Sequence, residues 1–184
     1  MEREGHLGTM LLLGAFALIG LGLFEGLVAT AVMGVADRLP DQDQYIPDSI
    51  IHHRGLTHSL MFTLIVAFVA ASTIAYPTRV GQQVAIEFDL LSTTVISPTR
   101  LWLFLSGAVT VSLLGHIATD ALTKGGGYKV EPLWPLSSWS VALGFCTSDD
   151  EWWNAALLAS GGTAFFAAVL HELYYSILPT VVGL

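Results

Sequence analysis

Six side chains able to hold a metal ion lie at the margins of long apolar runs in this 184-residue chain. Imidazoles and carboxylates beside hydrocarbon are costly, and a bound cation compensates for that cost. His116 and Asp120 are four residues apart on a helical stretch, so both side chains project from one face. The pattern predicts a metal site at a membrane surface. The candidate ligands are His6, Asp41, His53, His58, His116 and Asp120.

The segment His-Arg-Gly-Leu-Thr-His-Ser, residues 53–59, is the most specific of the motifs. Two imidazoles and a guanidinium directly precede an apolar run, and Gly55 allows a sharp turn of the backbone. We expect Arg54 to hold an anionic substrate by bidentate contact, and Thr57 to cap the helix that follows. The alternative is that these residues only anchor a helix end at the interface.

The segment Leu-Pro-Asp-Gln-Asp, residues 39–43, places two aspartates two positions apart. Asp41 is the candidate ligand. Asp43 is the candidate for general base, or for orienting a ligand imidazole, and the sequence leaves both roles open. A solvated acidic turn after the proline is the alternative.

The segment 115–127 joins the His116 and Asp120 pair to Thr123, one turn further on, and then to three glycines. Thr123 is a candidate contact for the substrate. The glycines lack the spacing of a Walker motif, so they do not predict a phosphate loop of that kind. The alternative for the pair is an ordinary hydrogen bond between helices.

Composition predicts an integral membrane protein. The chain is 53% hydrophobic and 12% charged, with a mean hydropathy of +0.65. Its uncharged runs approach the thickness of a bilayer, unlike the striped helices of soluble proteins. By length, residues 1–184 form one domain. The single cysteine excludes an internal disulfide and a thiolate metal cage, and the amino-terminal segment, lacking signal-peptide features, is expected to be retained.

The net charge is -8, and the chain has only two lysines but fifteen carboxylates. Abundant carboxylates with scarce lysine are typical of extreme halophiles, where salt screens the repulsion, so the composition suggests a halophilic archaeon. An ordinary acidic protein is the alternative. The acidic surface argues against binding to nucleic acid, which requires a basic face.

The apolar runs predict an all-α fold, a polytopic transmembrane bundle of about five membrane-inserted helices. Glu25 and the glycines near it favour a helical hairpin over one long first helix. Pro77 is expected to close the third run, and residues 78–100 to form a loop. The runs are 7–24, 27–36, 59–76, 101–122 and 152–178.

The hairpin also decides which face of the membrane carries the site. With five crossings, the amino terminus, the 37–57 loop and the 124–151 loop share one face, and these segments hold or adjoin all six candidate ligands. A single first crossing would instead separate His6 from Asp41. The positive-inside rule places this face in the cytoplasm, because five of the seven basic residues lie on it: Arg3, Arg38, Arg54, Lys124 and Lys129.

In order and approximate spacing, these motifs resemble the YdjM-like family of membrane-bound proteins, which are regarded as metal-dependent hydrolases. The resemblance runs from His6 to about Pro135 and includes Trp134-Pro135. It implies a divalent-metal hydrolase embedded in the membrane, with distant kinship to zinc-dependent phospholipase C and P1-type nucleases. It also implies that the six candidate ligands occupy the family's metal positions.

We therefore expect a hydrolase of phosphoesters, such as a phospholipid or a lipid-linked phosphate, in which a metal activates water. Nitrogen and oxygen ligands suit zinc or manganese better than magnesium, as one or two ions. The alternative is a non-enzymatic membrane protein with a structural or transported metal. His52 is expected to play a supporting or interfacial part, and His171 and Glu172 are expected to lie outside the site.

Overall fold

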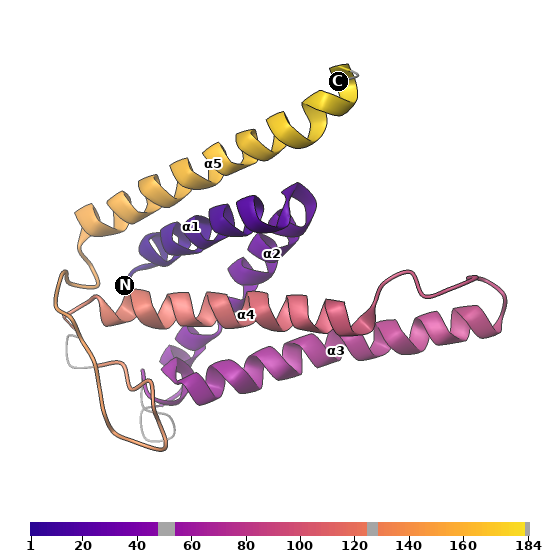
Figure 1. The fold of residues 1–184 in the computed structure, drawn as a ribbon. Coiled ribbons are helices and arrows are strands. Elements are labelled where there is room, and N and C mark those ends of the chain that lie inside the picture. Colours follow the sequence, from indigo (N-terminus) through magenta and orange to yellow (C-terminus); the bar gives the residue numbers. More distant parts are fainter. Residues whose placement is uncertain (48–53, 125–128, 183–184) are drawn as a thin grey trace.

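The computed structural model describes residues 1–47, 54–124 and 129–182, with side chains through residue 175. Five α-helices and two short 3₁₀ turns make up its regular structure, and the described residues form no β-strand beyond two isolated bridges. The elements are α1 (Arg3–Leu21), α2 (Leu23–Ala36), η1 (Pro40–Tyr45), η2 (Leu56–His58), α3 (Leu60–Glu87), α4 (Pro98–Ala121) and α5 (Glu151–Val182) (Figure 1). The expected all-helical bundle is confirmed.

Helices α1 and α2 form the expected hairpin, but the turn lies three residues earlier than Glu25. The chain reverses at Gly22, whose φ of +89° is a conformation that favours glycine. Glu25 lies in the first turn of α2 and is exposed. At 14 residues, α2 extends roughly 21 Å, which is shorter than a hydrocarbon core of about 30 Å. The hairpin nevertheless turns the chain back toward the end of the bundle where α1 starts (Figure 1).

Helices α3 and α4 form an antiparallel pair (Figure 1). Pro77 does not end α3, which continues to Glu87, so the expected loop of 78–100 is reduced to residues 88–97. A proline removes one helical hydrogen bond, and helices in a membrane tolerate this when the remaining bonds hold. Ser97 caps α4, its Oγ accepting a hydrogen bond from the Arg100 amide.

Helix α5 packs along α1 through glycines that bring the two backbones close together (Figure 1). A Cβ on Gly161 would overlap the carbonyl oxygen of Gly8, and a Cβ on Gly8 would overlap the backbone of Leu157. Small residues at such crossings are typical of helix packing in membranes. The contact fixes the first turns of α1, which carry His6.

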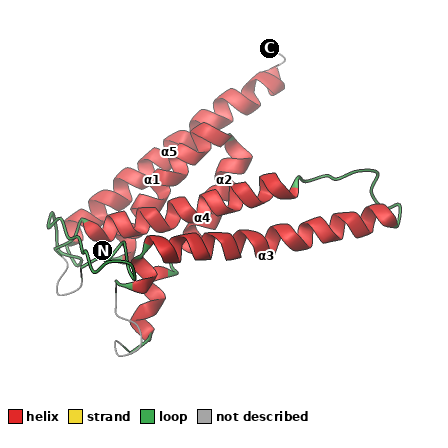
Figure 2. Ribbon diagram, turned by 60° about the horizontal axis from the view of Figure 1, so that its bottom comes forward, coloured by secondary structure: helices red, strands yellow, loops and turns green. Residues whose placement is uncertain are grey.

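Within the described residues, four helices are long and apolar enough to cross a membrane: α1, α3, α4 and residues Glu151–Tyr175 of α5. Large apolar side chains such as Phe16, Phe68 and Phe166 are more than half exposed on them, as expected for surfaces that face lipid. The starts of α1, α3 and α5 and the ends of α2 and α4 converge at one end of the bundle (Figures 1 and 2). The candidate site lies at this end.

Candidate metal centre

The carboxylate of Asp120 lies at the centre of the candidate site. It belongs to the last turn of α4 and is 2% exposed. Its Oδ1 atom is 3.2 Å from His6 Nε2, and its Oδ2 atom is 3.2 Å from His58 Nε2. His116 Nε2, one turn earlier on α4, is 4.0 Å from Oδ2, and the amino group of Met1 lies 2.5 Å from Oδ1. Histidines from three separate segments therefore meet one buried carboxylate.

His58 reaches this centre from η2 and is held from behind by Asp43. The Thr57 hydroxyl donates to Asp43 Oδ2 at 2.5 Å and lies 3.0 Å from His58 Nδ1. Because the Thr57 proton is directed at Asp43, the contact with His58 requires the imidazole to carry its proton on Nδ1. The lone pair of Nε2 then faces the Asp120 carboxylate. Burial lowers the pKa of His58 below its ordinary value, against the opposing effect of Asp120, which favours this neutral form.

His116 has a similar arrangement on the other side of the centre. Its Nδ1 atom is 3.3 Å from Oδ1 of Asp37, in the turn after α2, and its Nε2 atom is 3.5 Å from Oδ1 of Asp41 in η1. The His116 ring stacks on His6 with 3.9 Å between centroids. Burial alone would raise the pKa of the Asp41 carboxyl, but the contact with His116 keeps it below its ordinary value.

The donor set fits a metal ion. Ligand atoms about 2 Å from a common zinc ion lie roughly 3–4 Å from one another. Here one atom from each of four residues lies within 4.8 Å of the other three, and a second group of three shares His116. The buried Nε2 atoms of His6 and His116 face carboxylate oxygens, at 3.2 Å from Asp120 and 3.5 Å from Asp41. The two groups are Asp41, His58, His116 and Asp120, and His6, Asp37 and His116.

Arg54, two residues before η2, contacts the same central carboxylate. Its backbone adopts a φ of +63°, which is uncommon for a residue with a side chain and is frequent at functional sites. The guanidinium contacts both carboxylate oxygens of Asp120, at 3.2 and 3.3 Å, and Thr123 Oγ1 at 3.3 Å. The Arg54 amide donates to Asp43, and its carbonyl accepts from the Glu131 amide. Residues 54–58 are thus held between the acidic turn and the loop after α4.

A polar pocket of about 450 Å³ opens beside these ligands on the same end of the bundle. His6, Asp37 and Asp41 line its inner wall, so a small polar molecule in the pocket would reach the metal-binding groups directly. Its full lining is Met1, Glu2, Arg3, His6, Asp37, Arg38, Asp41, Gln42, Gln44 and Tyr45.

The structure brings together all the expected site residues that it describes. His53 and His52 lie outside the described residues, as do the three glycines at 125–127. His171 and Glu172 contact each other on α5 at 3.2 Å, some 20 residues past its start and hence roughly 30 Å along the helix.

Two assignments change. The cap of α3 is Ser59, whose Oγ accepts from the Phe62 amide, while Thr57 links His58 to Asp43. Asp37 was not expected in the site. Its position four residues before Asp41, at the end of an apolar run, was the only available signal.

With this geometry in place, comparison with known proteins decides the family. The model of the family described as YdjM inner membrane protein matches residues 1–182. The chain belongs to the YdjM family. The resemblance expected from the motifs is confirmed, and so is the expectation of a membrane protein.

A curated relative of this YdjM family member, "Inner membrane protein YbcI" of Escherichia coli (strain K12), is 33% identical over 115 residues. The match covers 62% of this chain and about half of the relative, 54%. No solved structure matches the chain. The comparisons thus support a membrane protein.

Proposed function

We propose that this protein is a divalent-metal-dependent hydrolase embedded in the membrane, acting on a phosphoester such as a phospholipid or a lipid-linked phosphate. The observation that carries this proposal is the convergence of buried histidines and aspartates beside an open polar pocket. A structural metal site is closed by its ligands, whereas a catalytic site keeps access for water and substrate. The Asp41 side chain is 37% exposed, so the inner wall of the pocket is open on this side.

In this proposal Asp41, His58, His116 and Asp120 hold one ion, and a second ion at His6, Asp37 and His116 would replace the contact between Asp37 and His116. Zinc or manganese suits these nitrogen and oxygen ligands. When bound, such an ion polarises the phosphoryl oxygen and lowers the pKa of a bound water, which supplies the nucleophile.

The roles of Asp43, Arg54 and Thr123 follow from their contacts. Asp43 is 2% exposed and accepts hydrogen bonds from Thr57 and from the Arg54 amide. It therefore orients His58, and of its two expected roles the geometry favours this one over general base. Arg54 and Thr123 form the polar wall beside Asp120, and we assign them the contact with phosphoryl oxygens.

The test is phosphate release by purified protein in lipid nanodiscs, with and without added zinc or manganese. His58→Ala and Asp120→Ala should each lower turnover by at least about a hundredfold, because each removes a ligand. His171→Ala is the matched histidine control, since its side chain is 51% exposed and lies far along α5, and it should retain activity. Full turnover in both site variants, or in metal-free wild-type protein, would overturn the proposal. Tight metal binding without turnover of any phosphoester would favour a structural or transported ion.

We also infer that the site faces the cytoplasm. This orientation is supported by the five basic residues at the end of the bundle that carries the site, against Arg79 and Arg100 toward the other end.

A further inference from the structure

An apolar groove between α1 and α2 lies beside the polar pocket of the candidate site. The groove has a volume of about 600 Å³ and is bordered by Phe165 of α5. Arg38 lines both cavities, and His6 and Leu7, adjacent on α1, line the pocket and the groove respectively. A single molecule with a polar head and an apolar tail could therefore occupy both at once.

The groove opens toward the surface that faces lipid. Leu7, Leu27 and Val35 on its walls are 40, 42 and 72% exposed. Gly34 lines the groove without a side chain. A Cβ at this position would meet only Met10, at 3.5 Å, so the groove has free space beside it. Such a groove accepts an acyl or isoprenoid chain directly from the bilayer, with no need to withdraw the lipid into water.

Arg38 is the cation at the junction. Its side chain is exposed and forms no ion pair within the described part of the chain. Arg38 lines the polar pocket, whereas Arg54, which is assigned a contact with phosphoryl oxygens, is buried beside Asp120. A guanidinium matches the geometry of a phosphate group and forms bidentate hydrogen bonds with it. Arg38 also lies next to Asp37, which contacts His116. A phosphate held by Arg38 would thus lie beside the metal-binding groups.

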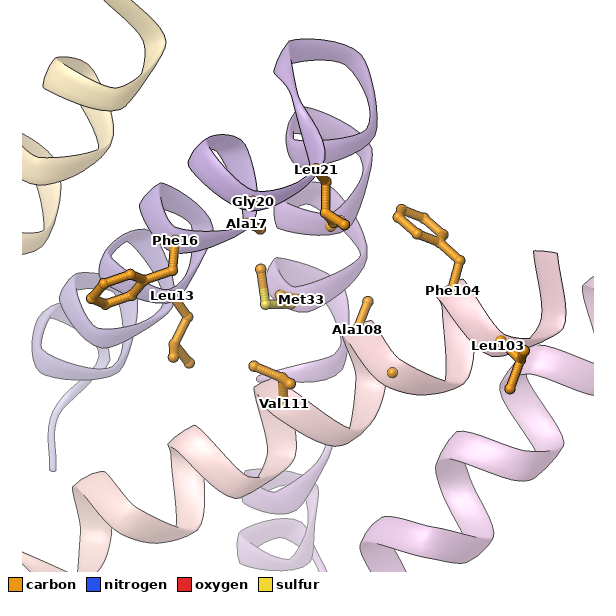
Figure 3. Close-up of a pocket in the computed structure, with 12 residues that line it drawn as sticks. Leu13, Phe16, Ala17, Gly20, Leu21, Met33, Leu103, Phe104, Ala108 and Val111 are labelled. Carbon is orange, nitrogen blue, oxygen red and sulfur yellow. The ribbon is translucent and has the colours of Figure 1, made fainter. Parts of the chain in front are cut away.

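A second apolar groove lacks this feature. The groove between α1, α2 and α4 has a volume of about 470 Å³ and is lined only by apolar side chains and glycines, among them Leu13, Met33 and Val111 (Figure 3). With no charged side chain at its rim, it offers nothing to select a headgroup. It provides a comparison surface of similar size.

We propose that the groove between α1 and α2 holds the hydrocarbon chain of a lipid phosphate, whose phosphate is anchored by Arg38 at the entrance to the site. This inference rests on the proposed function, because it names the substrate class of the same site: an anionic lipid phosphate that enters sideways from the bilayer.

The test is photolabelling in phosphatidylcholine nanodiscs with phosphatidic acid that carries a diazirine in its acyl chain. Peptides from α1 and α2 should be labelled. Arg38→Gln and Gly34→Leu should each reduce labelling about tenfold, by removing a charged hydrogen bond and by filling the groove. Gly107→Leu, which fills the comparison groove, where a Cβ would meet nothing within 4 Å, should leave labelling unchanged. Metal content and the elution profile on size exclusion report folding of each variant.

Equal labelling by the matching diacylglycerol probe, or labelling insensitive to Arg38→Gln and Gly34→Leu, would overturn the inference. Phosphate release distinguishes it from the proposed function. Specific labelling of the groove without any release means that the inference holds and the hydrolase proposal fails. Release from phosphatidic acid at the same rate in wild type and Gly34→Leu, with labelling insensitive to Gly34→Leu, means that the hydrolase proposal holds and the inference fails.

Discussion

At the scale of single residues, the site depends on imidazoles that are held from behind. His58 is oriented through Thr57 and Asp43, and His116 through Asp37, so both rings direct Nε2 toward the shared carboxylates. Partners of this kind fix the tautomer of a metal-binding histidine and increase its basicity.

Asp37→Asn should therefore weaken metal binding about tenfold without abolishing it, because the amide keeps the shape of the side chain but loses its charge. The measurement is zinc affinity by competition with a chelator. Asp149→Asn is the control, since Asp149 is fully exposed on the loop before α5 and should have no effect. An unchanged affinity in Asp37→Asn would show that His116 does not need this partner.

The sequence predicted the ligand types, because histidine and aspartate beside apolar runs have few inexpensive structural roles. It did not predict Asp37, because its contact requires the end of α2 to lie against α4. Nor could it choose between two roles for Asp43, since only the contact through Thr57 separates them.

At the scale of elements, glycines position the site. Gly22 reverses the chain between α1 and α2, and Gly8 and Gly161 bring α1 and α5 into contact. Periodicity and length predicted the helices, but their ends depended on details that composition does not show. The charge at Glu25 suggested a turn between the first two helices, and the structure places this turn at Gly22. Pro77 suggested the end of α3, but the helix continues to Glu87 because its other hydrogen bonds hold.

Gly161→Ala should destabilise the protein by about 1–3 kcal/mol, because its Cβ would overlap the Gly8 carbonyl and force α1 away from α5. His6 should shift with α1, so zinc affinity should fall as well. The neighbouring Gly162 is the matched control: a Cβ there meets nothing within 4 Å, and Gly162→Ala should be neutral or slightly stabilising. Thermal unfolding in detergent measures both. Equal melting temperatures for the two variants would contradict the close helix contact.

At the scale of the whole molecule, the arrangement of the helices gathers the site at one end. The starts of α1, α3 and α5 and the ends of α2 and α4 lie together there (Figure 1). This feature followed from sequence alone, because ligands on both sides of a membrane could not share an ion. What the sequence could not give is the depth of the site, since that depends on how the loops after α2 and α4 fold over it.

Cysteines placed singly at Gln44 and Ser138 should therefore react with a membrane-impermeant maleimide from the same side, and one at Ser92, in the loop between α3 and α4, from the opposite side. The background for this experiment is Cys146→Ala, which removes the single native thiol, a buried side chain that is 3% exposed. Positions 44 and 138 should react only after the cytoplasmic face is opened, given the positive-inside bias. Opposite accessibility of these two positions would contradict the shared face.

The acidic composition gives a second prediction at this scale. If the chain comes from a halophile, the melting temperature should rise as KCl increases from low to molar concentration, because screening reduces repulsion among the carboxylates. The alternative, an ordinary acidic protein, predicts little change beyond low ionic strength.

The central claim is that dispersed histidines and aspartates share a metal, and His116 tests it most directly because it belongs to both ligand groups. The measurement is the zinc content of purified protein after dialysis, compared among wild type, His116→Ala and His171→Ala. We predict one or two ions per chain in wild type and in His171→Ala, and a loss of bound zinc in His116→Ala. Zinc retained at the wild-type level in His116→Ala, or absent from all three proteins, would contradict the shared metal centre.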